Sequence, residues 1–175
     1  VVDGVAPAVR GGWSVLAAEP SDAVMLQDEY RDLLSGPDVD AVAEAAAGVC
    51  EYLDVTRADE RVDWAPVGES LAYHGHCNQT ALKRDHHAVG VLRRAGYGVD
   101  PLDSTCCGMA GSFGYEAEHL DLSRAVGELL FERVDASAAD VVVAPGASCR
   151  SQLRDRDGAG RPPHPLEKLA AALPS

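Results

Sequence analysis

Cysteine is the residue type in this chain with the most chemistry to offer. The five cysteines are Cys50, Cys77, Cys106, Cys107 and Cys149. An odd number of cysteines, with no secretion signal expected at the start of the chain, argues against a framework of structural disulfides. Thiols that cluster in a reducing compartment are more often metal ligands or redox groups. We therefore treat the cysteines as candidates for one of these two roles.

The elements that would position the cysteines alternate between strands and helices. Short apolar segments predict strands over residues 13–18, 71–74, 99–102 and 141–144. Helical periodicity predicts helices over 22–34, 39–53 (with Asp38 as its cap), 80–95, 117–134 and 166–173, with a short one after 148. We expect residues 57–68 to be a connection and 154–163 an exposed loop. This alternation predicts an α/β fold, in which helical crossovers join the strands of a parallel sheet.

Four of the five thiols follow the ends of predicted strands. Cys77 follows the strand over 71–74, Cys106 and Cys107 follow the strand over 99–102, and Cys149 follows the strand over 141–144. Parallel sheets bind ligands outside the carboxyl ends of their strands. Three strands that deliver cysteine to one edge are difficult to explain by packing alone. We expect the four thiols to meet at the carboxyl edge of the sheet.

The segment 106–114, CCGMAGSFG, is the most specific motif. Adjacent thiolates can face one centre only if the backbone bends sharply, and Gly108, Gly111 and Gly114 permit such bends. We expect a helix that begins near Glu116 to point its amide-rich end at the site. The spacing of the glycines differs from the dinucleotide-binding GxGxxG motif. A glycine-rich turn with two buried cysteines and a Cys106–Cys107 disulfide stay open as alternatives.

The spacing of the cysteines also bears on the kind of metal. The chain has no CxxC pair, so it does not match a zinc ribbon or zinc finger, although zinc at the same thiolates stays open. An iron–sulfur cluster takes four thiolates, and long gaps are natural when the ligands come from separate loops.

The remaining candidates have simpler interpretations. Cys50 lies within a predicted helix and is interpreted as a small buried hydrophobe. His74 and His76 flank the Cys77 loop, where each could pack at the strand end, donate to a sulfur or act as an extra ligand. We expect His86 and His87 on a helix surface and His164 at the start of the last helix. No Ser–His–Asp set or paired-carboxylate site can be recognised.

Composition limits the class of partner. The 175 residues are 46% hydrophobic and carry a formal charge of −13, which argues against nucleic acid or anionic lipid. Only Lys83 and Lys168 are lysines, and this acidic, lysine-poor composition is typical of a halophilic surface. No apolar run approaches the roughly 18 residues of a membrane span. Because the chain starts at Val1 without a leader, we expect a soluble, cytoplasmic protein or a fragment of a longer one.

Three segments together resemble a known family, the cysteine-rich CCG domain. They are HCNQ at 76–79, the run 106–114, and APGASCR at 144–150. This domain occurs in one subunit of heterodisulfide reductase and in iron–sulfur subunits of glycolate oxidase and anaerobic glycerol-3-phosphate dehydrogenase. The likeness extends over 71–173 and is strongest to the C-terminal part of fused FAD-linked D-lactate or D-2-hydroxyglutarate dehydrogenases.

The resemblance also implies a domain organisation. Family members usually carry two Rossmann-like CCG repeats, so residues 1–64 would be the end of a first, degenerate repeat and 65–175 the second, cluster-binding one. Asp22 stands where the first repeat often has a cysteine, and Gly146 stands where the fullest pattern has the first cysteine of a CxxC pair. A five-cysteine cluster is therefore not expected, and a four-cysteine site remains.

The function implied by the resemblance is electron transfer. Cys77, Cys106, Cys107 and Cys149 would hold one iron–sulfur cluster of the 4Fe–4S type, with Gly108 against it. Electrons would come from FAD on a partner domain or subunit that oxidises a D-2-hydroxy acid or glycerol 3-phosphate, and would pass to a quinone or another acceptor. Peripheral association with the inner face of the membrane is compatible with this role. Three alternatives remain: a zinc-binding structural or docking module, a thiol–disulfide reductase domain, and a decayed site that keeps only its interface.

Overall fold

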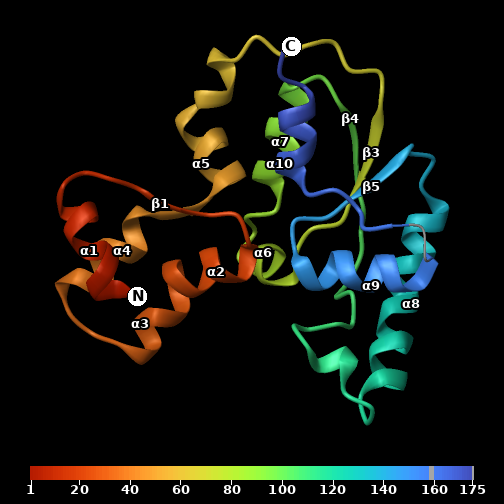
Figure 1. Cartoon of the computed structure of the whole chain (residues 1–175), viewed down its shortest axis with the longest axis horizontal. Coiled ribbons are helices and arrows are strands. Elements are labelled where there is room, and N and C mark those ends of the chain that lie inside the picture. The colour runs from red at the N-terminus through yellow and green to blue at the C-terminus, as the bar shows by residue number, and fades with distance from the viewer. Residues whose placement is uncertain (158–159, 175) are drawn as a thin grey trace.

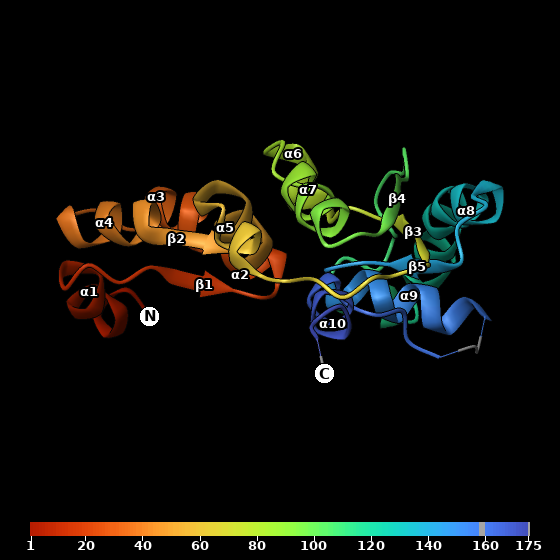
Figure 2. The ribbon, with the colours of Figure 1, turned by 90° about the horizontal axis from the view of Figure 1, so that it is seen from above.

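The chain forms two parallel sheets that lie side by side, each with its own helices (Figures 1 and 2). The computed structural model describes residues 1–157 and 160–174, without the side chain of Asp157. The predicted α/β class with parallel strands and helical crossovers is confirmed. Among the described residues, no helix combines the length and the apolar character needed to cross a bilayer.

The N-terminal part is built on a sheet of two short strands. Its elements are α1 (Val2–Arg10), β1 (Val15–Ala17), α2 (Pro20–Val24), a π-helical turn (Met25–Glu29), α3 (Tyr30–Leu33), α4 (Pro37–Ala45), β2 (Ala46–Gly48) and α5 (Val49–Thr56). Strands β1 and β2 pair in parallel, from Val15 with Ala46 to Ala17 with Gly48. A small apolar cluster of α1 and α4 side chains, among them Ala6 and Val42, forms the core of this part.

The single helix predicted over 39–53 is wrong. Helix α4 ends at Ala45, β2 follows, and α5 starts at Val49. The alanine-rich sequence of this region favours a helix, but pairing with β1 holds residues 46–48 in a strand. The side chain of Gln27 also donates to the carbonyl of Ala46 at 3.0 Å. The amide of Gly48 donates to Glu51 at 3.2 Å, which starts α5, and Asp38 is inside α4 rather than at its cap.

The C-terminal part has three strands in the order β4-β3-β5. A 3-10 turn (Ala58–Arg61) and a connection lead to β3 (Ser70–Tyr73), α6 (Cys77–Ala81), α7 (His86–Arg94), β4 (Gly98–Pro101), a 3-10 turn (Phe113–Tyr115), α8 (Leu120–Ala136), β5 (Val141–Val143), α9 (Ala147–Asp157) and α10 (Pro165–Ala171). The central strand β3 pairs in parallel with both neighbours. Alternate strand side chains therefore reach opposite faces of the sheet.

Helices cover both faces of this sheet (Figure 2). Leu71, Tyr73 and Val143 pack with α7 and α10 in one apolar cluster. On the other face Ala144 packs with Leu130 and Phe131 of α8, Leu153 of α9 and two of the cysteines.

Two further predicted bounds are wrong. The helix predicted over 80–95 is two helices, because the chain breaks at Lys83, whose φ of 56° is left-handed. Helix α9 continues through 154–157 into the expected loop, of which residues 158 and 159 lie outside the described part.

Candidate metal centre

Four cysteines lie at the carboxyl ends of the three strands of the larger sheet. Cys77 is the first residue of α6 after β3, and Cys106 and Cys107 are in the loop after β4. Cys149 is in the first turn of α9 after β5. This is the edge at which the sequence predicts the thiols to meet. Cys50 does not follow a strand of the larger sheet: it lies at the start of α5 and packs against the core of the C-terminal part, where burial raises the pKa of its thiol to about 12.

The four thiols form a row in which each interacts with the next. The Cys77 thiol influences that of Cys106, Cys106 that of Cys107, and Cys107 interacts with Cys149. Cys77 is exposed, whereas Cys107 and Cys149 are 3% and 2% exposed. The row therefore runs from the surface into the core, and it joins the loops of three strands.

Three thiols of the row, those of Cys77, Cys106 and Cys107, have a pKa above the ordinary value of a thiol. The pKa of Cys106 is raised by its hydrogen bond with Cys107 and then by burial. The pKa of Cys77 is raised by burial. The bond from Cys106 lowers the pKa of Cys107, but its bond with Cys149 and burial outweigh this and leave it at about 11. All five cysteines are free. Because the thiolate is the nucleophile, Cys77, Cys106 and Cys107 are poor attacking groups near pH 7, which weakens the thiol–disulfide alternative.

The glycine-rich loop turns its backbone toward the sulfurs. The amide of Gly108 donates to Sγ of Cys106 at 3.4 Å, and the amide of Met109 donates to Cys107. Gly108 has a left-handed φ of 87°, and a Cβ there would lie 2.2 Å from the carbonyl oxygen of Ser123. The side of α8 therefore packs against this loop. The expected helix start near Glu116 is wrong, because α8 begins at Leu120.

Two buried histidines flank the row. His74 is 1% exposed; its Nδ1 lies 2.7 Å from Oγ of Ser104, and its Nε2 is buried with no partner among the described residues. Burial lowers the pKa of His74 to about 4, against the attraction of Cys106, and burial also lowers that of His76. Both imidazoles are therefore neutral near pH 7. A buried nitrogen without a partner is costly, so His74 marks a place for a group that the chain itself does not supply.

The spacing of the thiols separates two kinds of metal. A single tetrahedral zinc ion needs sulfurs about 3.8 Å apart. Among the described residues, the groups with three ligand atoms within 4.8 Å of one another are Asp54 with His86 and His87, and Glu116 with Glu118 and His119. Neither contains a thiol, so the row is more widely spread than one zinc ion requires. Four thiols, inward-facing amides and an unpaired buried nitrogen fit a larger, anionic group such as an iron–sulfur cluster.

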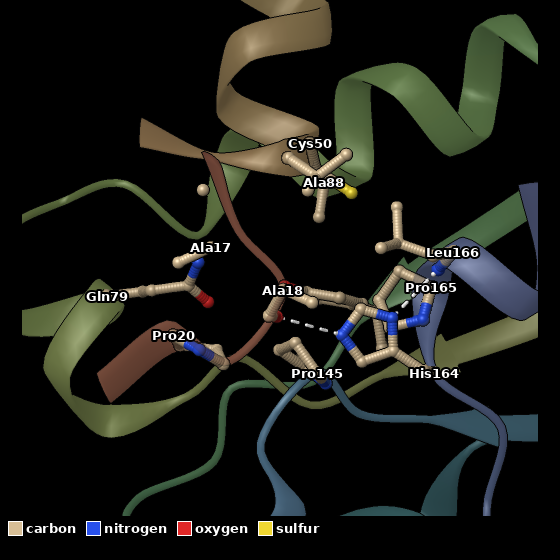
Figure 3. A pocket seen from close by; sticks show the side chains of 13 residues that line it. Ala17, Ala18, Pro20, Cys50, Gln79, Ala88, Pro145, His164, Pro165 and Leu166 are labelled. Carbon is tan, nitrogen blue, oxygen red and sulfur yellow. Dashed lines mark hydrogen bonds between the residues drawn. The ribbon is translucent and has the colours of Figure 1, made fainter. Parts of the chain in front are cut away.

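The N-terminal part contacts the loops beside the row. A cavity of about 20 Å³ lies at this junction. Figure 3 shows Ala17, Ala18 and Pro20 on one side of it and Pro145 and His164 on the other. Nε2 of His164 lies 3.2 Å from the carbonyl oxygen of Ala18, while its Nδ1 caps α10, as its predicted place implies.

A carboxylate makes a second contact across this junction. Oε2 of Glu19 accepts from the amide of Ala147, the first residue of α9, at 3.0 Å. Sequence reasoning missed Glu19, whose only signal is its place just before Pro20.

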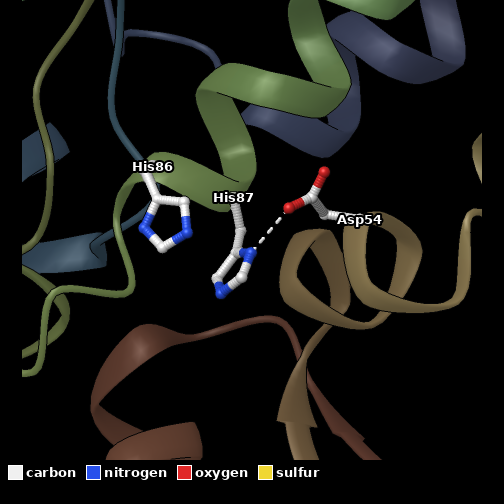
Figure 4. Close-up of side chains that lie close together, drawn as sticks. All are labelled: Asp54, His86 and His87. Carbon is white, nitrogen blue, oxygen red and sulfur yellow. Dashed lines mark hydrogen bonds and ion pairs between the residues drawn. The ribbon is translucent and has the colours of Figure 1, made fainter.

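The group of Asp54, His86 and His87 belongs to the same junction, and Asp54 and His87 already interact with each other there (Figure 4). Nδ1 of His87 lies 2.7 Å from one carboxylate oxygen of Asp54, and Arg94 donates to the other at 2.5 Å. Arg94 also donates to Asp59, which is fully buried. The group therefore joins α5 to α7 as an ion-pair network. His86 is exposed as predicted, but His87 is not a free surface residue.

The C-terminal part of the chain matches a known protein family, and most of the chain is similar to two dehydrogenase proteins. Residues 71–154, which include all four thiols of the row, match the family model described as a cysteine-rich domain, CCG. The chain is 29% identical over 166 residues to a subunit of the anaerobic glycerol-3-phosphate dehydrogenase of Escherichia coli K12, covering 93% of this chain and 41% of that protein. It is 31% identical over 165 residues to D-2-hydroxyglutarate dehydrogenase of the same strain, covering 90% of this chain and 15% of that protein.

These matches have two consequences. The chain spans less than half the length of the curated relatives it matches. The resemblance of the sequence to the cysteine-rich CCG domain is confirmed, because residues 71–154 match the model of that family.

Proposed function

We propose that this chain is the iron–sulfur electron-transfer part of a flavin-linked dehydrogenase that oxidises a D-2-hydroxy acid or glycerol 3-phosphate. The observation that carries the proposal is the row of four thiols at the ends of three neighbouring strands. The names of the two relatives support the class of reaction, since both are dehydrogenases.

Cys77, Cys106, Cys107 and Cys149 would hold one 4Fe–4S cluster. Such a cluster, when bound, accepts and releases single electrons. The amides of Gly108 and Met109 would stabilise the negative charge on the sulfurs, as they already face two thiols. Burial of Cys107 and Cys149 would exclude water from one end of the site, and the exposed Cys77 would keep the other within reach of a partner.

The rest of the assembly follows from the same proposal. Residues 1–64 would be the end of a degenerate first CCG repeat, and 65–175 the cluster-binding repeat. FAD would lie on a partner domain or subunit, and a quinone or another carrier would take the electrons, at the cytoplasmic face of the membrane. The acidic, lysine-poor composition supports a surface adapted to high salt.

The test is the metal content of protein purified without oxygen. Iron and acid-labile sulfide near about four each per chain, with an electron paramagnetic resonance signal after reduction, are expected for a 4Fe–4S site. Zinc without sulfide would favour a structural or docking module. A protein that takes up neither metal after reconstitution would contradict the proposal.

A further inference from the structure

His76 has a defined hydrogen-bonding state, because the start of helix α6 fixes one of its ring nitrogens. The residue is 6% exposed and is the N-cap of α6, whose first residue is Cys77. Its Nδ1 accepts a hydrogen bond from the amide of Asn78 at 3.3 Å. A ring nitrogen that accepts from an amide carries no proton, so the proton of the neutral ring is on Nε2. Nε2 is therefore a donor and has no lone pair for a metal.

The absence of a side chain at Gly146 lets this imidazole approach the loop of Cys149. A Cβ at position 146 would lie 2.3 Å from Cδ2 of His76 and 3.2 Å from its Nε2. The same point is 3.2 Å from Sγ of Cys149. The edge of the ring that carries the donor and the sulfur of Cys149 therefore border one small space, which only glycine leaves open.

We propose that His76 is a positioning residue that donates its Nε2 proton in a hydrogen bond to sulfur at Cys149 and thereby raises the reduction potential of the site. This inference rests on the proposed iron–sulfur function. A donor stabilises negative charge on sulfur, and the reduced state carries one more electron than the oxidised state. The donor therefore stabilises the reduced state more.

Two substitutions separate donation from helix capping. His76→Asn keeps a short acceptor that can cap α6 but does not reach the sulfur. His76→Gln places an amide N–H near the position of Nε2 and gives up the short cap. We expect His76→Asn to shift the reduction potential to a more negative value at unchanged iron content, and His76→Gln to stay close to the wild type. His86→Asn, at an exposed histidine, is the matched control and is expected to leave the potential unchanged.

The readouts distinguish failure of this inference from failure of the proposed function. Redox titration of the iron-loaded whole chain gives the potential, and ¹⁵N NMR of the metal-free chain gives the tautomer of His76. Wild-type potential in His76→Asn, a shift confined to His76→Gln, or a proton on Nδ1 would each overturn the inference alone. A wild-type chain that holds no iron and sulfide would overturn the proposed function and this inference with it.

Discussion

The two sheets use the same strand-to-helix turn for different purposes. In the N-terminal part β1 leads through Ala18 and Glu19 into α2, and the first turn of that helix carries Asp22. In the C-terminal part β5 leads into α9, whose first turn carries Cys149. The connection from β1 to α2 therefore carries carboxylates, whereas the connection from β5 to α9 leads to a thiol. The two turns also meet, because Glu19 accepts from the first amide of α9. The N-terminal part thus contacts, through Glu19, the helix that carries Cys149.

Glycines of the two parts also differ in the space that surrounds them. Gly12 and Gly36 of the N-terminal part adopt positive φ with nothing within 4 Å of an added Cβ, so they serve only to turn the chain. Gly108, Gly114 and Gly146 lie in the segments that carry Cys106, Cys107 and Cys149, and an added Cβ at each would lie within 2.3 Å of another atom. Close packing therefore requires glycine at these three positions of the C-terminal part.

The largest effect is expected from removing a thiol of the row. Cys107→Ser should lower bound iron by roughly tenfold or more, since even residues outside the ligand shell are worth roughly 10–100-fold in metal affinity. Cys50→Ala is the matched control, because this thiol packs against the core and is not one of the four thiols of the row, and it should keep wild-type iron. Iron and sulfide analysis of both variants checks the contrast. Equal iron in wild type and Cys107→Ser would remove the distinction between the two kinds of cysteine.

A second test compares two glycines of the same loop. Gly108→Ala combines a left-handed residue with a Cβ 2.2 Å from the carbonyl oxygen of Ser123, and should cost about 4 kcal/mol of unfolding free energy. Gly111→Ala has a φ of 71° but nothing within 4 Å, and should cost only about 1 kcal/mol. Urea denaturation of both variants measures the difference. Equal costs would mean that backbone conformation, and not packing against α8, fixes the loop.

Much of the C-terminal part could be predicted because its signals are local. The run of three valines at 141–143 is short and β-branched, which predicts a strand, and the cysteines follow strand ends in the sequence itself. The meeting of the thiols then follows from the geometry of a parallel sheet. The bend at Gly108 could be predicted as well, because two adjacent thiols can face one centre only if the backbone bends beside them.

The features that sequence reasoning missed depend on contacts between distant residues. Strand β2 is made of alanine and glycine and exists because β1 pairs with it. The role of Gly146 depends on the ring of His76, seventy positions earlier, and that of Glu19 on an amide 128 positions later. No local pattern carries such information.

Arg94 of α7 forms ion pairs with Asp54 of α5 and with Asp59 of the 3-10 turn that follows α5. Arg94→Met leaves the fully buried Asp59 without its cation and should cost about 3 kcal/mol of unfolding free energy. Arg93→Met, one position earlier on the same helix, loses a hydrogen bond to the carbonyl of Val99 at an exposed place and should cost about 0.5 kcal/mol. Thermal unfolding of both variants gives the comparison. Equal costs would mean that the ion pairs of Arg94 contribute little to stability.

The smallest expected effect concerns the carboxylate that links the two turns. Burial raises the pKa of Glu19 above its usual 4.5, although the amide of Ala147 and Arg150 oppose this. The folded state therefore holds the proton of Glu19 more tightly than the unfolded state, and wild-type stability should fall as the pH rises from 4.5 through the raised pKa. Glu19→Gln keeps an acceptor for Ala147 and removes this titration.

The difference between Glu19→Gln and the wild type should thus be near zero at acid pH and grow, in favour of the variant, to less than about 1 kcal/mol at neutral pH. Glu167→Gln is the control of opposite sign. The amide of His164 lowers the pKa of Glu167, so its contribution is present above pH 4.5 and is lost as the pH falls. Urea denaturation between pH 4 and pH 8 compares the three proteins. A difference for Glu19→Gln that does not change with pH would mean that this carboxylate stays solvated, and that the two turns meet without burying a charge.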